Sequence, residues 1–474
     1  MNYEVVVGLE VHVELATKTK IFCSCTTEFG GEPNTQVCEV CLGMPGTLPV
    51  LNRAVVDFAV RTGLALNCEV ACCNKFDRKN YFYPDLPKAY QISQLYLPIC
   101  HDGFIEIGKS ETCKKIRIKE IHMEEDAGKL IHDADEINTL VDYNRCGVPL
   151  LEIVSQPDMR SAEEAVEYIE KLRVILQYIG VSDCKMQEGS LRADINLSVR
   201  PVGSFELGVR TEMKNMNSFK AIARAIKAES ERQIALLEKG EKVIQETRRW
   251  DDSEGQSYAM RSKEEAQDYK YFPEPDIPPV VISQEQIDAT RAAIPELPDK
   301  KIERYTQLGL TDHDAEIIAG SVYLAKLFEC TYEVCGNAKE AANWILVDLL
   351  KLLHDSAKQP EDMDFNFDSL GKIILMVEKG KINRGTAKKV FEKVFEENIN
   401  PAEYVEDNNL GLVTDTDTIY ATVETVVKDN EKSVNEYKSG KTQALQYLIG
   451  QSMKALRGQA PAQTVTEILK DLLN

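Results

Sequence analysis

The sequence lacks long apolar runs, a basic leader and an excess of positive charge. No hydrophobic segment approaches the roughly 20 residues needed to cross a bilayer, so we expect no transmembrane helix and no membrane partner. The opening residues, MNYEVVVGLE, have neither the basic start of a signal peptide nor the Arg and Ser bias of a transit peptide, which favours a cytoplasmic location. A net charge of −21 repels polyanions at long range, so any RNA contact needs local basic patches.

Internal repeats and low-complexity segments are also missing, and no GxGxxG turn follows a predicted strand. We therefore expect neither a Rossmann nor a P-loop nucleotide site, and a bound nucleotide would lie on an open sheet face through a metal. The chain has 474 residues, more than the roughly 250 to 300 at which a single hydrophobic core stops growing. Two or three domains are expected.

Four of the 13 cysteines are spaced like zinc ligands. CSC places Cys23 and Cys25 two apart, CEVC places Cys38 and Cys41 three apart, and twelve residues separate the pairs. Two such knuckles complete a tetrahedral site with no open position, so the zinc would be structural. The alternative is four unliganded thiols. We interpret the remaining cysteines as reduced, small apolar fillers. They are Cys68, Cys72, Cys73, Cys100, Cys113, Cys146, Cys184, Cys330 and Cys335.

The pattern of apolar residues changes near residue 295. Before it, short alternating segments predominate, and two helices are predicted at 161–180 and 218–240 from apolar residues at helical spacing between Ser and Gly signals. After it the patterns are helical, and NNLGLVTDTD reads as a linker into a small carboxy-terminal unit. We predict an α+β domain over 1–294, an all-α domain over 295–408 and a helical tail over 409–474.

The stretch GLEVHVEL alternates apolar residues with Glu10, His12 and Glu14, so a strand here places three ionisable side chains on one face. Three other segments also combine acids with a cation or an imidazole; they are IRIKEIHMEEDAGK, LRADINLSV and VRTEMK. Several such strands can together form a site for Mg²⁺, which takes carboxylate and phosphate oxygens. The alternative is a set of solvated polar faces with incidental acids.

Cations alternate with aromatic residues in KFDRKNYFYPDLPKAYQIS, residues 75–93, and in DYKYFPEPDIPP, residues 268–279. ETRRWD adds the adjacent Arg248 and Arg249. We interpret both longer segments as loops suited to phosphate or to the exposed end of an RNA strand. The alternative is a pair of loops that pack their aromatic rings on the core and leave their charges in water.

These segments are similar to one known family. GLEVHVEL, KFDRKNYFYPDLPKAYQISQ, HMEEDAGK, NRCGVPLLEIVSQPDMRS, QEGSLRADINLSVR, EMKNMNSF, ETRRWD and DYKYFPEPDIPP together resemble the B subunits of the aspartyl/glutamyl-tRNA amidotransferases, the GatB/GatE family. The resemblance runs from residue 3 to about 295 and continues more loosely to GKTQALQYLIGQSMKALRGQA. It implies a glutamine synthetase/guanido kinase-like catalytic domain with an antiparallel sheet, a helical domain and a YqeY-like tail that binds tRNA.

The resemblance also implies a reaction and partners. Such an enzyme takes Glu-tRNA(Gln) or Asp-tRNA(Asn), phosphorylates the side-chain carboxylate with ATP, and displaces the phosphate with ammonia. The ammonia comes from the amidase (A) subunit, and a small (C) subunit joins the amidase to the B chain. Phosphorylation comes first because the oxide of a carboxylate is a poor leaving group, and phosphoryl transfer needs a metal and cations to carry charge.

The resemblance points to particular residues. Glu10, His12 and Glu125 are the expected metal ligands and catalytic residues, with Glu124, Asp194 and Glu212 as further Mg²⁺ candidates. Lys79 is expected to be catalytic, and phosphate contacts are expected from Arg78, Lys79, Arg210 and Lys214. Because an imidazole is an unusual ligand for Mg²⁺, a Mn²⁺-like ion would suit His12 better. The alternative for His12 is a polar strand residue with no ligand.

The tail is nearly neutral on a strongly acidic chain. Residues 410–474 contain seven Lys or Arg and eight Asp or Glu residues, so this end repels RNA less than the rest of the chain. Lys441, Lys454 and Arg457 are candidates to face phosphates, whereas the alternative is a helical hairpin whose charges merely solvate it. Two rival functions are a zinc-stapled tRNA adaptor without catalysis and a free-standing ATP-dependent ligase for a small amino acid.

Overall fold

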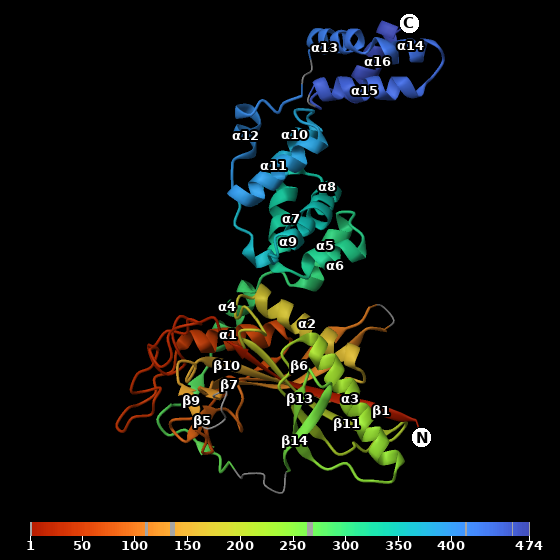
Figure 1. Cartoon of the computed structure of the whole chain (residues 1–474). Coiled ribbons are helices and arrows are strands. Elements are labelled where there is room, and N and C mark those ends of the chain that lie inside the picture. The colour runs from red at the N-terminus through yellow and green to blue at the C-terminus, as the bar shows by residue number, and fades with distance from the viewer. Residues whose placement is uncertain are drawn as a thin grey trace. The chain divides into compact units, whose positions relative to one another are not determined.

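The computed structural model describes residues 2–109, 112–132, 138–262, 269–412, 415–456 and 458–473. The chain divides into two compact units, Met1–Pro298 and Asp299–Asn474. The first is a mixed α/β unit with a large sheet, and the second is helical (Figure 1). Arg457, which was expected to face phosphates, and Asp268, the first residue of the segment 268–279, lie outside the described residues.

A nine-stranded sheet forms the centre of the first unit, in the order β14-β13-β12-β11-β1-β10-β7-β6-β2. Its strands are β1 (Tyr3–Glu14), β2 (Glu69–Val70), β6 (Cys100–Ile107), β7 (Lys114–Glu125), β10 (Pro149–Ser155), β11 (Leu191–Pro201), β12 (Thr211–Lys214), β13 (Glu246–Asp251) and β14 (Gln256–Ser262). The expected antiparallel sheet needs one correction, because β12 and β13 pair in parallel. Helix α3 lies between them in sequence and supplies the crossover that a parallel pair needs.

Three helices pack on the apolar face of this sheet: α1 (Arg53–Ala65), α2 (Ala162–Tyr178) and α3 (Phe219–Glu238). The two longer ones confirm the predicted helices, and each begins after a serine cap, Ser161 or Ser218, whose hydroxyl accepts a backbone N–H. On β1 the residues Leu9, Val11 and Val13 join the buried core with these helices. The opposite face of β1 therefore carries the alternating polar residues.

The two segments rich in cations and aromatic residues are not simply loops. Strands β4 (Asp77–Asn80) and β5 (Tyr90–Ser93) pair with each other, and β15 (Phe272–Pro273) pairs with β4 to form a three-stranded sheet. The two segments, about 190 residues apart in sequence, thus lie side by side. Two short pairs complete the β structure: β16 (Val280–Val281) with β3 (Cys73–Asn74), and β8 (Lys129–His132) with β9 (Thr139–Asp142). Helix α4 (Gln284–Ala293) closes the unit.

The described part of the second unit is helical. They are α5 (Pro298–Gln307), α6 (Asp312–Ala319), α7 (Val322–Cys335), α8 (Ala338–Asn343), α9 (Leu350–Asp355), α10 (Asp368–Glu378), α11 (Arg384–Glu397), α12 (Pro401–Asp407), α13 (Thr416–Asp429), α14 (Glu431–Lys438), α15 (Gln443–Ala455) and α16 (Ala462–Leu473), with a π-helical segment at Trp344–Leu349 and a 3₁₀ turn at Pro360–Asp362. The last four helices share their own apolar core around Val423, Leu448 and Leu469. Among the described residues, no helix is both long and apolar enough to cross a membrane.

The interpretation of nine cysteines as apolar fillers holds for only part of them. Cys68, Cys100, Cys146, Cys184 and Cys335 are buried, Cys330 is half-buried, and Cys72, Cys73 and Cys113 are exposed. The exposed three were wrongly predicted because spacing carries no information on burial when a cysteine stands outside a regular apolar pattern. All 13 thiols are free of disulfide bonds.

A buried charge network fixes α3 to the sheet. Glu229 is 1% exposed, and its carboxylate accepts hydrogen bonds from Thr211 Oγ1 at 2.9 Å and Arg232 Nη2 at 2.7 Å. Arg248 Nε lies 3.5 Å from the other carboxylate oxygen. Although burial raises the pKa of Glu229, the Arg232 guanidinium and the other hydrogen-bond donors outweigh it and hold the pKa below its ordinary value.

We expect Glu229→Ala to lower the free energy of unfolding by about 3 kcal/mol, because it leaves Arg248 buried without this carboxylate. Urea unfolding of the purified chain measures the loss. Glu231→Ala, at an exposed position of the same helix, is the matched control and should change stability by less than about 0.5 kcal/mol. Equal losses in both variants would contradict the role given to the network.

Candidate active site

The polar face of the large sheet gathers ionisable side chains from five strands. The register pairs His12 with Glu152 of β10 and Glu10 with Asp194 of β11. Strands β7 and β12 continue the face on either side. The residues of the predicted site therefore come from segments up to about 200 positions apart in sequence, and they fall into two clusters.

The first cluster consists of His12, Glu124 and Glu152, whose ligand atoms all lie within 4.8 Å of one another. His12 Nε2 is 3.6 Å from Glu124 Oε1, and Glu124 is only 3% exposed. Burial, followed by repulsion from Glu152, raises the pKa of Glu124 above its ordinary value. Two acids and an imidazole that point at one space are a donor set for a divalent ion, and an ion there would relieve the repulsion.

Glu152 is a functional candidate that sequence reasoning missed. It stands in PLLEIVS, a strand whose residues are apolar apart from this glutamate and the terminal serine. A single acid in an otherwise apolar strand was the available signal, because burying a charge is costly unless it has a partner.

The second cluster consists of Glu10, Asp194 and Glu212, again within 4.8 Å. Lys214 Nζ contacts Asp194 Oδ2 and lies 2.8 Å from Glu212 Oε1. Burial, followed by the Glu152 charge, raises the pKa of Glu10. Burial also acts to raise the pKa of Glu212, but the Lys214 ammonium and the hydrogen bonds outweigh it and lower that pKa.

Lys79 is close enough to the first cluster for the charges of Glu124 and Glu152 to act on it, but it forms no ion pair with either glutamate among the described residues. It extends from β4, and its ammonium lies 5.0 Å from the ring centre of Tyr269 and 5.8 Å from that of Tyr81. Burial acts to lower the pKa of Lys79, yet the carboxylate of Glu124 and other neighbouring groups raise it overall, so the side chain is a fixed cation. Arg210 is exposed just before β12, and its positive charge helps to lower the pKa of Glu212.

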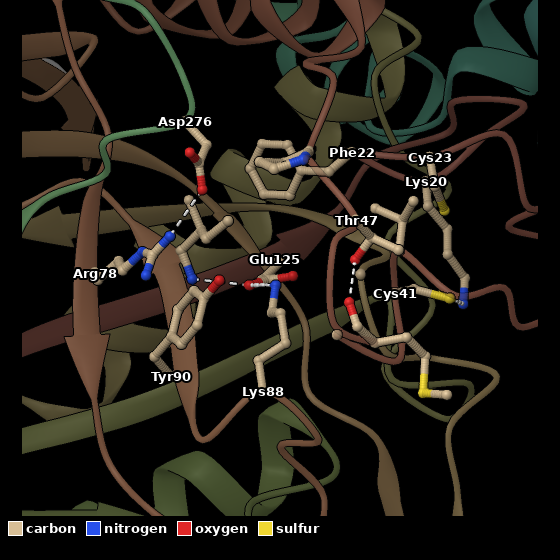
Figure 2. Close-up of a pocket in the computed structure, with 16 residues that line it drawn as sticks. Lys20, Phe22, Cys23, Cys41, Thr47, Arg78, Lys88, Tyr90, Glu125 and Asp276 are labelled. Carbon is tan, nitrogen blue, oxygen red and sulfur yellow. Dashed lines mark hydrogen bonds and ion pairs between the residues drawn. The ribbon is translucent and has the colours of Figure 1, made fainter.

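Glu125 and Arg78 lie apart from these clusters. Glu125 accepts a hydrogen bond from Ile92 N at 2.8 Å and contacts Lys88 Nζ, whereas Arg78 binds Glu274 (Nε to Oε2, 2.6 Å) and Asp276. Figure 2 shows both in a cavity of about 240 Å³ that Cys41 and Tyr90 also line. The expected grouping of Glu125 with the metal ligands is therefore corrected: successive residues of a strand point to opposite faces, so Glu124 and Glu125 diverge, as do Arg78 and Lys79.

The four predicted zinc cysteines do come together. The sulfur atoms of Cys23, Cys25, Cys38 and Cys41 all lie within 4.8 Å of one another, and Cys38 Sγ is 3.9 Å from Cys41 Sγ. Lys20 Nζ lies 3.8 Å from Cys41 Sγ. A hydrogen bond from Cys23, with help from Lys20, lowers the pKa of Cys41 to about 5 despite its burial. Four sulfur donors from two knuckles fit a tetrahedral Zn²⁺.

The expectation that the sequence has no P-loop overlooked one stretch that has the letters of the consensus, although not its structure. GFIEIGKS, residues 103–110, has the GxxxxGK[ST] spacing of a P-loop. Gly103 to Ile107 belong to strand β6, and the next named element is strand β7. The described part of the stretch therefore lacks the strand, loop and helix arrangement that cradles phosphate.

The fold and the site define a class of protein: an α/β enzyme domain that gathers carboxylates, an imidazole and lysines on an open sheet face, followed by a helical region. Residues 5–288 match the family described as the GatB/GatE catalytic domain, and residues 326–473 match that described as the GatB domain. The chain belongs to the GatB/GatE family.

Curated relatives match over their whole length. The aspartyl/glutamyl-tRNA(Asn/Gln) amidotransferase B subunit of Lachnoclostridium phytofermentans is 59% identical over 473 residues, which cover 100% of this chain and 99% of the relative. The B subunit of Lachnospira eligens is 57% identical, with 100% and 99% covered. That of Agathobacter rectalis is 54% identical, with 100% of both chains covered.

Proposed function

We propose that this chain is the B subunit of a glutamine-dependent amidotransferase that converts Glu-tRNA(Gln), Asp-tRNA(Asn) or both to the amidated forms. The observation that carries the proposal is the first cluster with Lys79 beside it, in a chain that matches the named relatives over its full length. The amidase (A) subunit would supply ammonia, and the small (C) subunit would join the two. The cytoplasm is the compartment where such an enzyme meets tRNA.

The proposed reaction has two balanced steps. An oxygen of the tRNA-bound side-chain carboxylate attacks the γ-phosphorus of ATP and ADP leaves. Ammonia then attacks the acyl carbon, and inorganic phosphate leaves with one of the ammonia protons. His12, Glu124 and Glu152 would hold a Mg²⁺ or Mn²⁺ ion, which supplies charge stabilisation to the phosphate oxygens. Lys79 holds a positive charge beside that cluster, where it can neutralise the transferring phosphoryl group.

Further assignments rest on the same proposal. Glu10, Asp194 and Glu212 would serve the second cation position, with Lys214 and the exposed Arg210 near the phosphates. The four cysteines would hold a structural Zn²⁺. The large sheet would be of the glutamine synthetase/guanido kinase type, residues 295–408 a helical domain, and residues 409–474 a YqeY-like tail that binds tRNA.

Reconstitution tests the proposal. The chain is mixed with its amidase and small partner subunits, ATP, Mg²⁺, glutamine and Glu-tRNA or Asp-tRNA, and the amidated aminoacyl-tRNA is measured together with ADP. We expect ADP and amidated tRNA in equal amounts. Equal amidation of free glutamate would instead favour the free-standing ligase, and tRNA binding without ADP formation would favour the non-catalytic adaptor.

We expect Lys79→Met to slow amidation by about 100-fold, because it removes a half-buried positive charge beside the first cluster. The glutaminase activity of the complex should persist, since it belongs to the amidase in this proposal. Lys119→Met removes an exposed lysine of β7 and serves as the control, with amidation unchanged. Amidation that survives fully in Lys79→Met would remove this lysine from the site.

A further inference from the structure

The two carboxylate clusters differ in whether a lysine already contacts their acids. In the second cluster, Lys214 contacts two of the three acids, and the side chain of Lys214 is 37% exposed. In the first cluster, Glu124 and Glu152 form no ion pair with a lysine or arginine within 4 Å in the part of the chain that the structure describes. The first cluster is thus open to an external cation, and the second has an internal one.

Hydrogen bonds orient two of the three acids around Lys214. Asn196 Nδ2 donates to Glu10 Oε1 at 2.8 Å, and Thr247 Oγ1 donates to Glu212 Oε2 at 2.8 Å. Asn196 and Glu212 are also register partners between β11 and β12. Lys214 Nζ therefore already contacts two of the three carboxylates that a divalent ion in this cluster would use as ligands.

We propose that Lys214 is a resident counter-ion that keeps the second cluster closed to a divalent ion until the phosphates of the nucleotide draw its ammonium away. A lysine suits this role because its ammonium is a point charge on a flexible four-carbon stem, and more than a third of the side chain reaches solvent. The free protein then holds one divalent ion, at His12, Glu124 and Glu152. The inference rests on the proposed function, because it takes the first cluster as a metal site.

Manganese titration tests the inference without a catalytic readout. The intact complex, free of nucleotide, is titrated with Mn²⁺ in a calorimeter, and free Mn²⁺ is counted by electron paramagnetic resonance. We expect one bound ion in the wild type and two in Lys214→Met. Lys214→Gln, which keeps a polar side chain, is a second variant and should also bind two. Lys115→Met, at an exposed ion pair on β7, is the matched control and should bind one.

The possible results separate the inference from the proposed function. One ion in both the wild type and the Lys214 variants, with thermal unfolding unchanged, overturns the inference alone. Two ions in the wild type also overturn it alone, because the lysine then does not exclude the second ion. An absence of Mn²⁺ from every protein contradicts the metal site of the proposed function and the inference together.

Discussion

Replacing Glu124 with glutamine is expected to lower ATP-dependent amidation by the reconstituted complex on the order of 1,000-fold. The substitution keeps the shape of the side chain but removes the most buried carboxylate of the first cluster, where His12 Nε2 is 3.6 Å away. A metal ion at a phosphoryl-transfer site contributes several kcal/mol to stabilisation of the transition state, and a neutral amide holds it poorly. The rate of amidated tRNA formation measures the loss, and glutamine hydrolysis should continue in part.

Glu125→Gln provides the matched control for this prediction. Glu125 is as buried as Glu124 and adjacent to it in sequence, but its side chain points to the opposite side of β7. The discriminating readout is Mn²⁺ affinity of the intact complex: we expect it to fall sharply in Glu124→Gln and to stay at the wild-type level in Glu125→Gln. The reverse pattern would restore Glu125 as the ligand and remove Glu124.

Cys41→Ser is expected to abolish zinc binding and to lower the free energy of unfolding by about 3–5 kcal/mol. Cys41 is buried among the four sulfurs. The segment between the two knuckles is held on the rest of the domain by hydrogen bonds, among them Gln36 N to Asn144 Oδ1 at 2.9 Å and Asn34 N to Asp142 Oδ1 at 3.1 Å. Without the metal these bonds must order the segment alone. Metal analysis and urea unfolding of the purified chain measure both effects.

The control for the zinc prediction is Cys72→Ser, at an exposed cysteine outside the cluster. It should keep one zinc per chain and the stability of the wild type. A wild-type protein that contains no zinc after purification without chelators would end the assignment, and would leave the four cysteines as free thiols.

Local pattern was enough to predict several parts of the structure. The alternation around Glu10 and His12 predicted a strand with one polar face, and the spacing of Cys23 and Cys25 from the second pair predicted a cluster that the structure assembles. The helices after Ser161 and Ser218 were predicted from caps and apolar spacing. Each of these features depends on residues close together in sequence, for which backbone geometry determines the outcome.

Other features could not be predicted from residues that are close together in sequence. Residues 75–93 were predicted to be a loop because of their prolines and charges. In the structure they contain the short pair β4 and β5, and β15, about 190 residues further along the chain, adds the third strand. The parallel pairing of β12 with β13 depends on where α3 returns the chain. GFIEIGKS has the letters of a phosphate loop, yet its first five residues, Gly103 to Ile107, pair with β7 as part of strand β6.

By itself, the sequence determined which residue types stand on each face of β1, where two helices begin and which cysteines converge. The tertiary structure alone decided the membership of the site. It brought Glu152 to His12, directed Glu125 away from Glu124, and placed Lys214 among the acids of the second cluster. The physical reason is that strand register, set by packing across the whole sheet, decides which side chains from remote segments share one space.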